Sequence, residues 1–435
     1  MPEAITVIKS AGAETEAREP ALTTRQKLEL KMKIFERGVV LSDAAREKMG
    51  GPGGNLLTTD HYYVTTRDPI LNIQGTFINS PVSTEDKPFS RDANKPPYMV
   101  AVVNDSLVLE VDGRQLKIDH LPPPEYQALG DEVSEDISTH TDRGRESPLK
   151  GCKIGCHFCN IPWEFQKAKM TPVDKLVKAA KVAIADKVRP MQHLLLSGGT
   201  PKTQGEFDYL QDVYRKMAEE FVKTDENGNK HGLDIEIMMT PSVAPDGTDL
   251  LDLDGLHELG IKRLSINMEL GNMAQTYRVK GEDGKEREVE IMAGKNKIGK
   301  EQYMNTLKRA VQLFGVGNVK SMLIVGLEPV EQTLQLAEEL AQIGVCPELS
   351  PFRPDPLTPL GDHPPASFED QIAAYDGVQE IIAKYKSEFP GLSDGLECVD
   401  CMHNVDMIED EDSFRTHYDP VTETTTYMPA AQGVN

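Results

Sequence analysis

The residues best suited to chemistry in this chain are three closely spaced cysteines. Cys152, Cys156 and Cys159 follow a C-x-x-x-C-x-x-C pattern, and the chain has only six cysteines among its 435 residues. Thiolates are soft ligands that bind iron–sulfur clusters, zinc and copper(I). A closed structural site normally has four protein ligands, so three thiolates on one short loop predict an iron–sulfur cluster with one iron open to a second ligand.

Two other interpretations of this segment stay open on the residues alone. The same cysteines could hold zinc with a fourth ligand from elsewhere, and His157 lies among them. The cysteines could also be buried side chains without a metal, because a free cysteine packs as a small hydrophobe.

Strand and helix patterns alternate after residue 146, and these elements would position the cysteines. Apolar runs bounded by turn residues predict strands, and apolar residues three and four apart predict helices. Repeated strand–helix units of this length indicate a parallel sheet with helices packed outside it. The predicted strands are 193–197, 234–239, 263–268, 321–325 and 345–349, and the predicted helices are 172–185, 204–222, 250–259, 301–314 and 331–343.

The cysteine segment resembles the signature of the radical SAM superfamily. In that family three cysteines hold a 4Fe-4S cluster whose fourth iron binds the amino and carboxylate groups of S-adenosylmethionine, and Phe158 matches the aromatic residue before the last cysteine. Leu194–Pro201 reads LLLSGGTP and is similar to the glycine-rich stretch that contacts the methionine end of the cofactor. The resemblance therefore implies cofactor contacts at Gly198, Gly199 and Thr200, where missing side chains let the backbone approach a ligand closely.

Two later segments are similar to further strands of the same family. Ser265–Glu269 looks like the fourth strand, which ends in a polar residue near the cofactor ribose, so the resemblance assigns that role to Glu269. Ile324–Glu328 resembles the fifth strand, which lines the adenine, and this implies a contact at Gly326. Its acid, Glu328, stands one place before the G-x-x-E position of the family.

A proline-rich segment near residue 355 and one basic residue complete the resemblance. Pro351–Leu360 is similar to the F-x-P-x-x-G-T-P-L ending of the biotin-synthase and hydrogenase-maturase branch, with Leu357 in the place of glycine. Arg278 is a candidate cation for the cofactor carboxylate. The implied fold is α/β: a partial, six-stranded, TIM-like (β/α)6 barrel with the cluster at its C-terminal mouth, where barrel enzymes place their sites.

Three domains are expected around this barrel. Residues 1–145 form an N-terminal extension of helices plus a β-hairpin, because a helical pattern covers 24–37 and an Asp-Gly turn joins strand patterns near residue 112. Residues 146–365 form the barrel, and 366–435 form a C-terminal helix and a C-x-x-C segment. A charged, proline-containing stretch, 121–148, is interpreted as a linker, and the polar stretch 280–300 as a surface excursion or lid.

The C-terminal segment carries a second pair of cysteines. Cys398 and Cys401 are too few for a complete site, and Cys346 or His403 could add a third ligand. Several radical SAM groups carry an auxiliary cluster in such an extension. An auxiliary iron–sulfur cluster, a zinc site and free thiols are all open, and Cys346 could equally be a buried packing residue.

The composition excludes some classes of partner. The chain has 47 basic and 70 acidic side chains, a net charge of −23, and no basic stripe that would bind nucleic acid. No apolar run approaches the length of a membrane span, and the N-terminus lacks the apolar core of a signal peptide. Locally clustered cysteines fit metal binding in a reducing compartment, so we expect a cytoplasmic protein.

The resemblance implies a radical SAM enzyme with a 4Fe-4S cluster and S-adenosylmethionine as cofactors. It would take electrons from an external donor of the flavodoxin or ferredoxin type and act on a small-molecule biosynthetic substrate. One alternative is radical modification of a peptide or protein. The other is an iron–sulfur or zinc-binding protein without catalytic turnover, which would leave the glycine-rich stretch and the barrel pattern unexplained.

Overall fold

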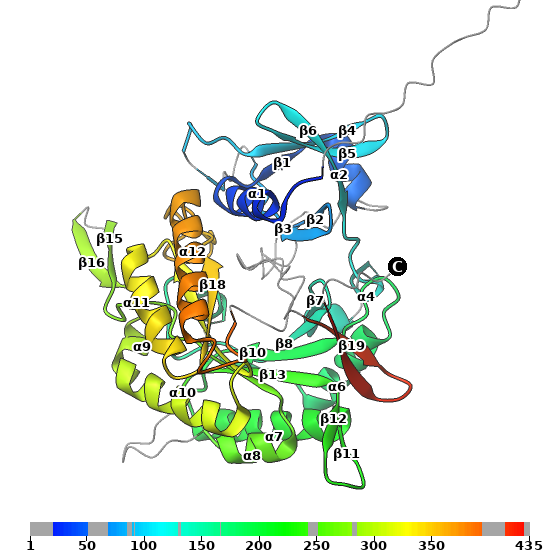
Figure 1. The fold of residues 1–435 in the computed structure, drawn as a ribbon, viewed down its shortest axis with the longest axis vertical. Coiled ribbons are helices and arrows are strands. Elements are labelled where there is room, and N and C mark those ends of the chain that lie inside the picture. Colours follow the sequence, from blue (N-terminus) through cyan, green and yellow to red (C-terminus); the bar gives the residue numbers. More distant parts are fainter. Residues whose placement is uncertain are drawn as a thin grey trace, which may run out of the picture.

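The structure is a computed structural model whose central feature is a curled parallel sheet (Figure 1). It describes residues 21–50, 68–84, 89–90, 92–128, 132–165, 167–241, 251–280, 285–393 and 414–429. Six strands of the sheet run parallel: β8 Arg143–Lys150, β10 His193–Gly198, β13 Asp234–Met239, β14 Arg263–Ile266, β17 Val319–Val325 and β18 Cys346–Pro351. The predicted partial (β/α)6 barrel is therefore confirmed.

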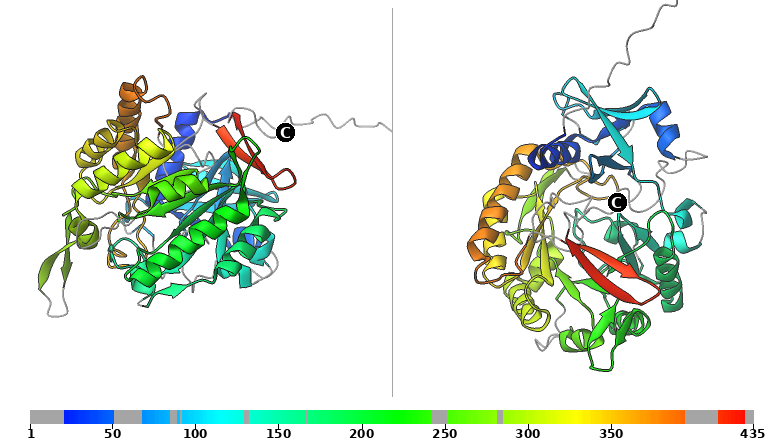
Figure 2. Two further views of the ribbon diagram at one scale, coloured as in Figure 1. Left: turned by 90° about the horizontal axis from the view of Figure 1, so that it is seen from below. Right: turned by 45° about the vertical axis from the view of Figure 1, so that its right-hand side comes forward.

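Helices cover the outer face of this half-barrel, as Figures 1 and 2 show. They are α6 Val173–Ile184, α7 Gln204–Phe221, α8 Leu253–Leu259, α10 Lys300–Phe314, α11 Val330–Ala341 and α12 Phe368–Tyr385. Local signals set their ends. The Thr203 side chain accepts a hydrogen bond from the Glu206 amide at the start of α7, and Gly260 ends α8 in the left-handed conformation at φ +87°.

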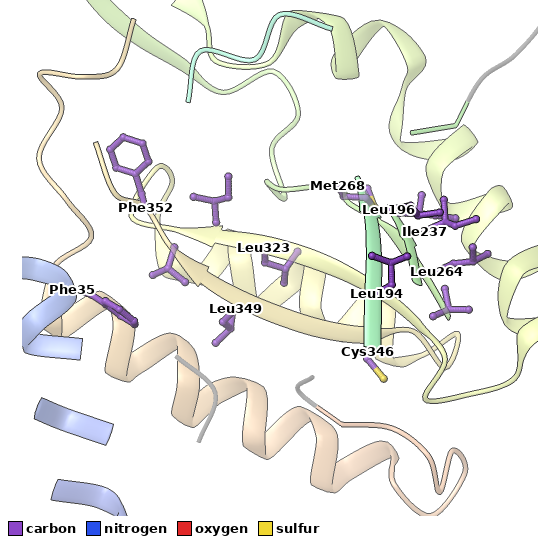
Figure 3. Close-up of a cluster of buried hydrophobic side chains, with 14 of the residues drawn as sticks. Phe35, Leu194, Leu196, Ile237, Leu264, Met268, Leu323, Cys346, Leu349 and Phe352 are labelled. Atoms are coloured by element: carbon purple, nitrogen blue, oxygen red, sulfur yellow. The ribbon is translucent and has the colours of Figure 1, made fainter. Parts of the chain in front are cut away.

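The two faces of the half-barrel differ because side chains alternate along each strand. The outward face is apolar and packs against the helices, and Figure 3 shows part of this core. Leu194, Ile237, Leu264, Leu323 and Leu349 are all buried there.

The inward face of the half-barrel is charged in its lower half, away from the C-terminal strand ends. The Lys320 ammonium lies 3.2 Å from a Glu236 carboxylate oxygen and 3.1 Å from one of Glu348, and Arg263 lies 3.1 Å from Asp234. Buried charges are tolerated when they are paired, because each partner replaces lost hydration. Lys320, Glu236 and Glu348 are called the barrel triad below.

The stretch 121–148, interpreted from the sequence as a linker, belongs to the sheet instead. It contains the antiparallel edge strand β7 Ile137–Thr139 and most of β8. The charged pattern of β8 arises because Arg143 and Arg145 stand on the inward face. Pro148 lies where the pairing register with β10 shifts, a place where a missing backbone N–H is tolerated.

The N-terminal extension forms a second sheet with the order β1-β4-β5-β6-β2-β3. The predicted hairpin joins β5 and β6 through Asp112 and Gly113, which have φ of +48° and +76°. The elements of this region are α1 Thr24–Arg37, α2 Asp43–Gly50, β1 Val39–Leu41, β2 Ile70–Ile73, β3 Thr76–Asn79, β4 Tyr98–Val103, β5 Ser106–Val111 and β6 Arg114–His120, and α4 Glu125–Ala128 and η2 Glu132–Glu135 follow it.

Hydrogen bonds tie this N-terminal region to both edges of the half-barrel. On one edge, Arg353 after β18 donates to the Asn79 side chain at 2.9 Å. On the other, Arg189 donates to the backbone carbonyl of Leu121, just after β6, at 2.7 Å and to that of Thr139 in β7 at 3.3 Å. The N-terminal region therefore connects the two ends of the curled sheet.

The stretch 280–300, expected to be a surface excursion or lid, holds ordered elements near the mouth. A hairpin of β15 Thr276–Lys280 and β16 Glu286–Glu290 leads into α9 Ala293–Ile298. Ile291 and Met292 between them are buried, so the chain returns to the core here.

The remaining short elements lie at the mouth and at the periphery. They are α5 Ile161–Glu164 and β9 Lys169–Met170 after the cysteines, β11 Val222–Thr224 with β12 Lys230–Gly232, and β19 Phe414–Asp419 with β20 Thr424–Pro429. None of the described helices is both long and apolar enough to cross a membrane.

Candidate active site

The three cysteines lie on the loop that follows β8, at the C-terminal edge of the sheet. Gly151 turns the chain out of the strand with φ +103°. Cys152, Cys156 and Cys159 then line one cavity of about 950 Å³, including the space open to solvent. Strands β8, β10 and β13 contribute Arg145, Ser197 and Met238 to the same cavity, and Asn267 follows β14.

Backbone hydrogen bonds fix the cysteine loop in place. The Lys153 amide donates to the Thr200 carbonyl at 3.2 Å, and the His157 amide donates to the Ile291 carbonyl at 2.8 Å. The Cys152 sulfur accepts from the amides of Ile154 at 3.4 Å and Thr200 at 3.3 Å. Hydrogen bonds to sulfur are among the features by which a protein sets the potential of an iron–sulfur cluster.

The three thiols fit the donor set of an iron–sulfur cluster. Within the described residues, no three His, Cys, Asp or Glu side chains converge as one metal ion requires. The three thiols instead border a shared cavity, which suits a cluster because each thiolate binds a different iron. Burial raises the pKa of the Cys159 thiol to about 11 and also raises that of Cys156, so iron must displace protons when it binds.

The diglycine turn packs directly on the cysteine loop. A Cβ on Gly199 would fall 1.7 Å from the Gly151 carbonyl oxygen, and Gly198 has φ +133° with its Cβ position 2.7 Å from the Leu149 carbonyl oxygen. A side chain at Gly199 would thus displace the loop that carries Cys152 as well as obstruct a ligand.

A buried ion pair faces the cavity from the other side. The Lys295 ammonium, from α9, donates to a Glu269 carboxylate oxygen at 2.8 Å and to the Asn267 carbonyl at 2.6 Å. Burial acts to lower the pKa of Lys295, but Glu269 together with Tyr303 and Cys156 outweighs it and the net shift of this pKa is upward. Lys295 is therefore a cation at neutral pH, within a cavity that also holds the three thiols.

Glu269 has an unusual backbone conformation. Its φ of +72° is disfavoured for a residue with a Cβ and is held by hydrogen bonds on both sides. The Glu269 amide donates to the Met322 carbonyl at 3.0 Å, and its carbonyl accepts from the Ile324 amide at 2.8 Å. The chain therefore maintains a strained residue at the point where its carboxylate enters the cavity.

Glu328 holds the turn that follows Glu269. Its two carboxylate oxygens accept from the amides of Gly271 at 2.7 Å and Asn272 at 2.9 Å, and the Thr333 hydroxyl donates to it at 3.2 Å. Glu328 is not among the residues that line the cavity. The Glu328 carboxylate thus fixes the turn at Gly271 and Asn272 and does not face the cavity.

Comparison with known proteins decides the class of this site. The model of the Radical SAM superfamily matches residues 147–340. These residues form a radical SAM domain. Such a domain implies a 4Fe-4S cluster and S-adenosylmethionine as cofactors, and the three cysteines that line the cavity match that donor set.

Comparisons with solved structures and with curated proteins give less information about this chain. The chain is similar to the X-ray structure of the FeFe-hydrogenase maturase HydG from Carboxydothermus hydrogenoformans, with 14% sequence identity and a TM-score of 0.38. That match covers 56% of this chain and 52% of the maturase, so it spans about half of the length of each protein. No curated protein matches the chain.

The structure brings together some of the residues predicted for the radical SAM domain. Phe158, Gly198, Gly199, Thr200 and Glu269 all line the cavity with the cysteines. The Thr200 hydroxyl also donates to the Thr240 hydroxyl at 3.1 Å.

Other predicted residues lie elsewhere. Arg278 is exposed on β15, 3.9 Å from Glu286 across the hairpin, and does not line the cavity. Gly326, at φ +99°, lies beside Ala366, which a Cβ would approach to 2.8 Å.

The remaining cysteines are away from the mouth or outside the description. Cys346 is buried at the first residue of β18, the opposite end from the cavity, with its sulfur 3.9 Å from the Ser393 hydroxyl. Cys398, Cys401 and His403 lie outside the described residues.

Sequence reasoning missed Lys295. It stands in a polar stretch with several other lysines, and nothing in its immediate neighbours separates it from a surface residue. One usable signal was the apolar pair Ile291-Met292, which marks a return to the core. In the structure Gly294 lies close to the cysteine loop, because a Cβ there would fall 2.3 Å from the Ile154 carbonyl oxygen.

Proposed function

We propose that this chain reductively cleaves S-adenosylmethionine at a 4Fe-4S cluster and performs radical chemistry on a small-molecule biosynthetic substrate. The observation that carries the proposal is a shared cavity. The three cysteines, the diglycine turn and the Glu269–Lys295 pair all border it, although they come from widely separated parts of the sequence.

The roles of the chain's own residues follow from this arrangement. When bound, the cluster and S-adenosylmethionine supply one-electron chemistry: cleavage of a carbon–sulfur bond and abstraction of a hydrogen atom from the substrate. Cys152, Cys156 and Cys159 hold the iron, and the backbone of Gly198 and Gly199 lets the cofactor lie close. The apolar side chains of the cavity wall would help to shield reactive species from water.

The Glu269–Lys295 pair suits a zwitterionic ligand. The methionine end of S-adenosylmethionine carries a carboxylate and an ammonium group, and the pair presents one charge of each sign to the same cavity. Charge-assisted hydrogen bonds of this kind are about twice as strong as neutral ones. Lys295 therefore takes the role that the sequence had suggested for Arg278.

The side chains that line the cavity are consistent with a compact, partly apolar substrate. Phe207, Leu210, Met238, Met239 and Leu251 line it together with the more polar Arg145. We further propose a cytoplasmic location, because thiols that must bind iron need a reducing compartment.

A product assay tests this function. The anaerobically reconstituted chain with dithionite and S-adenosylmethionine is expected to release 5′-deoxyadenosine or another cleavage product, detected by mass spectrometry. Cys156→Ala removes one iron ligand and should abolish the product, and zinc-loaded parent chain serves as a control that should also give none. Absence of any cleavage product from the iron-loaded parent would reject the proposal.

We also propose that the C-terminal cysteines bind an auxiliary iron–sulfur cluster. The support is that Ser393, the last described residue before Cys398 and Cys401, lies against Cys346. Iron content should be roughly eight per chain for two 4Fe-4S clusters and fall to about four in the Cys398→Ala, Cys401→Ala double variant. About four irons in the parent, unchanged by the double substitution, would remove the auxiliary cluster.

A further inference from the structure

A further charged side chain lines the cavity in addition to the Glu269–Lys295 pair. Apart from the thiols, which iron takes, the charged residues among the described side chains of the lining are Arg145, Glu269 and Lys295. Glu269 and Lys295 offset each other, because their charged atoms lie 2.8 Å apart. Arg145 therefore makes this lining positive on balance, although the chain as a whole has a net charge of −23.

Arg145 reaches the cavity from the floor of the half-barrel. In the register of the sheet, Arg145 on β8 is opposite Leu195 on β10, and Leu195 is opposite Glu236 of the barrel triad. Glu236 is not among the residues that line the cavity. The Arg145 guanidinium instead donates to the hydroxyl of Ser197, which lies nearer the mouth on β10, at 3.4 Å. The long side chain of Arg145 thus carries a positive charge from the layer of the triad into the cavity.

This cation is separate from the pair that suits the cofactor. Arg145 stands on β8, whereas Glu269 and Lys295 follow β14, and strands β10 and β13 lie between β8 and β14 in the sheet. Neighbouring strands are ~4.8 Å apart, so β8 and β14 are separated by roughly 14 Å along the sheet. The cavity therefore has two distinct groups of charge, which suits two ligands bound side by side.

The contacts of Ser197 also favour an anion at this end of the cavity. Its hydroxyl accepts from Arg145 at 3.4 Å and donates to the Met238 sulfur at 3.5 Å. The first contact is longer than the about 2.7–3.2 Å of most N–H···O bonds, and a thioether sulfur is a weak acceptor. A carboxylate oxygen here would accept from both the guanidinium and the hydroxyl, and such charge-assisted bonds are about twice as strong as neutral ones.

We propose that Arg145 and Ser197 form a subsite for a carboxylate group of the substrate. The inference rests on the proposed function and names the class of its substrate, a small carboxylic acid. The body of the acid lies against the apolar side chains of Phe207, Leu210 and Met239, which line the same cavity. A planar carboxylate matches the fork of the guanidinium, so this contact sets the orientation of the substrate as well as its affinity.

Equilibrium binding of matched carboxylates and amides tests the subsite without requiring turnover. Phenylacetate and hexanoate are titrated into the cluster-loaded chain in the presence of S-adenosylmethionine, and phenylacetamide and hexanamide are the neutral probes. Each amide has nearly the shape of its carboxylate but lacks the charge. At least one of the two carboxylates is expected to bind the parent chain about 10-fold more tightly than its amide.

Variants assign this preference to the subsite. Arg145→Gln should reduce the preference for the carboxylate to no more than about twofold, with the iron content of the parent. Arg145→Lys keeps the charge without the fork and should retain part of the preference, which separates loss of recognition from loss of folding. Arg278→Gln removes an equal charge from the exposed hairpin and should keep the preference of the parent.

Three results would overturn the subsite. The first is a parent chain that binds neither carboxylate more tightly than its amide. The second is a preference for the carboxylate that Arg145→Gln leaves intact. The third is a loss of S-adenosylmethionine affinity in Arg145→Gln as large as its loss of carboxylate affinity, which would place Arg145 in the cofactor site. If the parent fails to cleave S-adenosylmethionine, the proposed function fails, and the binding measurements still decide the subsite.

Discussion

Among the buried charges inside the half-barrel, the barrel triad and the Glu269–Lys295 pair are built differently. The barrel triad stands on three regular strands, and its side chains are 3–4% exposed. The Glu269–Lys295 pair is 8–11% exposed, and it joins a residue of positive φ to an inserted helix. The triad is sealed within the sheet, whereas the pair borders the cavity of the thiols.

This difference separates a structural role from a binding role. In the triad one ammonium lies between two carboxylates on nearby strands and away from the cavity, so we expect it to stabilise the sheet. The pair includes Glu269, whose backbone is strained, and strained residues cluster at sites where ligands bind. Breaking the triad should therefore affect folding most, and breaking the pair should affect cofactor binding most.

The largest effect is expected for Lys320→Met. The change leaves the buried Glu236 and Glu348 carboxylates without their cation, which typically costs about 3–5 kcal/mol. Chemical denaturation of the anaerobic protein measures the loss. Lys308→Met, at an exposed position on α10, is the matched control and should change stability by no more than about 0.5 kcal/mol. Equal stability of the two variants would show that the triad is not structural.

The Lys295→Met change is expected to reduce folding stability less than Lys320→Met does. It should weaken cofactor binding strongly. Loss of one charge-assisted contact should weaken S-adenosylmethionine binding by about 10- to 100-fold, because such bonds contribute about 1.5–3 kcal/mol. Equilibrium binding to the reconstituted protein gives the affinity, and iron content should stay at the parent level. Lys297→Met, on the exposed side of the same helix, should bind normally. Parent-like affinity in Lys295→Met would remove this lysine from the cofactor site.

The smallest effect is expected for Glu328→Gln. The amide can accept from only one of the Gly271 and Asn272 amides, so the turn after Glu269 loses one anchoring hydrogen bond of about 1–2 kcal/mol. Cofactor affinity should fall by roughly 5- to 20-fold, with iron retained. The exposed Glu331→Gln on α11 is the control. A loss of affinity in Glu328→Gln as large as that in Lys295→Met would mean that Glu328 contacts the ligand directly.

Local patterns were sufficient for much of the fold. The alternation of strands and helices from β10 to α12 appears in the sequence because the outward face of each strand and one face of each helix are apolar. The cysteine segment could also be predicted, because its three cysteines lie close together in the sequence.

What the sequence did not reveal depends on contacts between distant residues. β8 was missed because Arg143 and Arg145 face a charged interior, so the strand has no apolar run. The importance of Lys295 arises from its meeting with Glu269 across 26 residues, which no local pattern encodes. Glu328 likewise acts on amides 56 and 57 residues before it.

The most direct test of the central claim is the EPR spectrum of the reduced cluster with and without S-adenosylmethionine. Three thiolates leave one iron free to bind the cofactor, so addition of S-adenosylmethionine should change the signal of the parent protein. The Lys295→Met variant should show the same change only at higher cofactor concentration. A reduced cluster whose spectrum is identical with and without saturating S-adenosylmethionine would contradict the assignment of this cavity as the cofactor site.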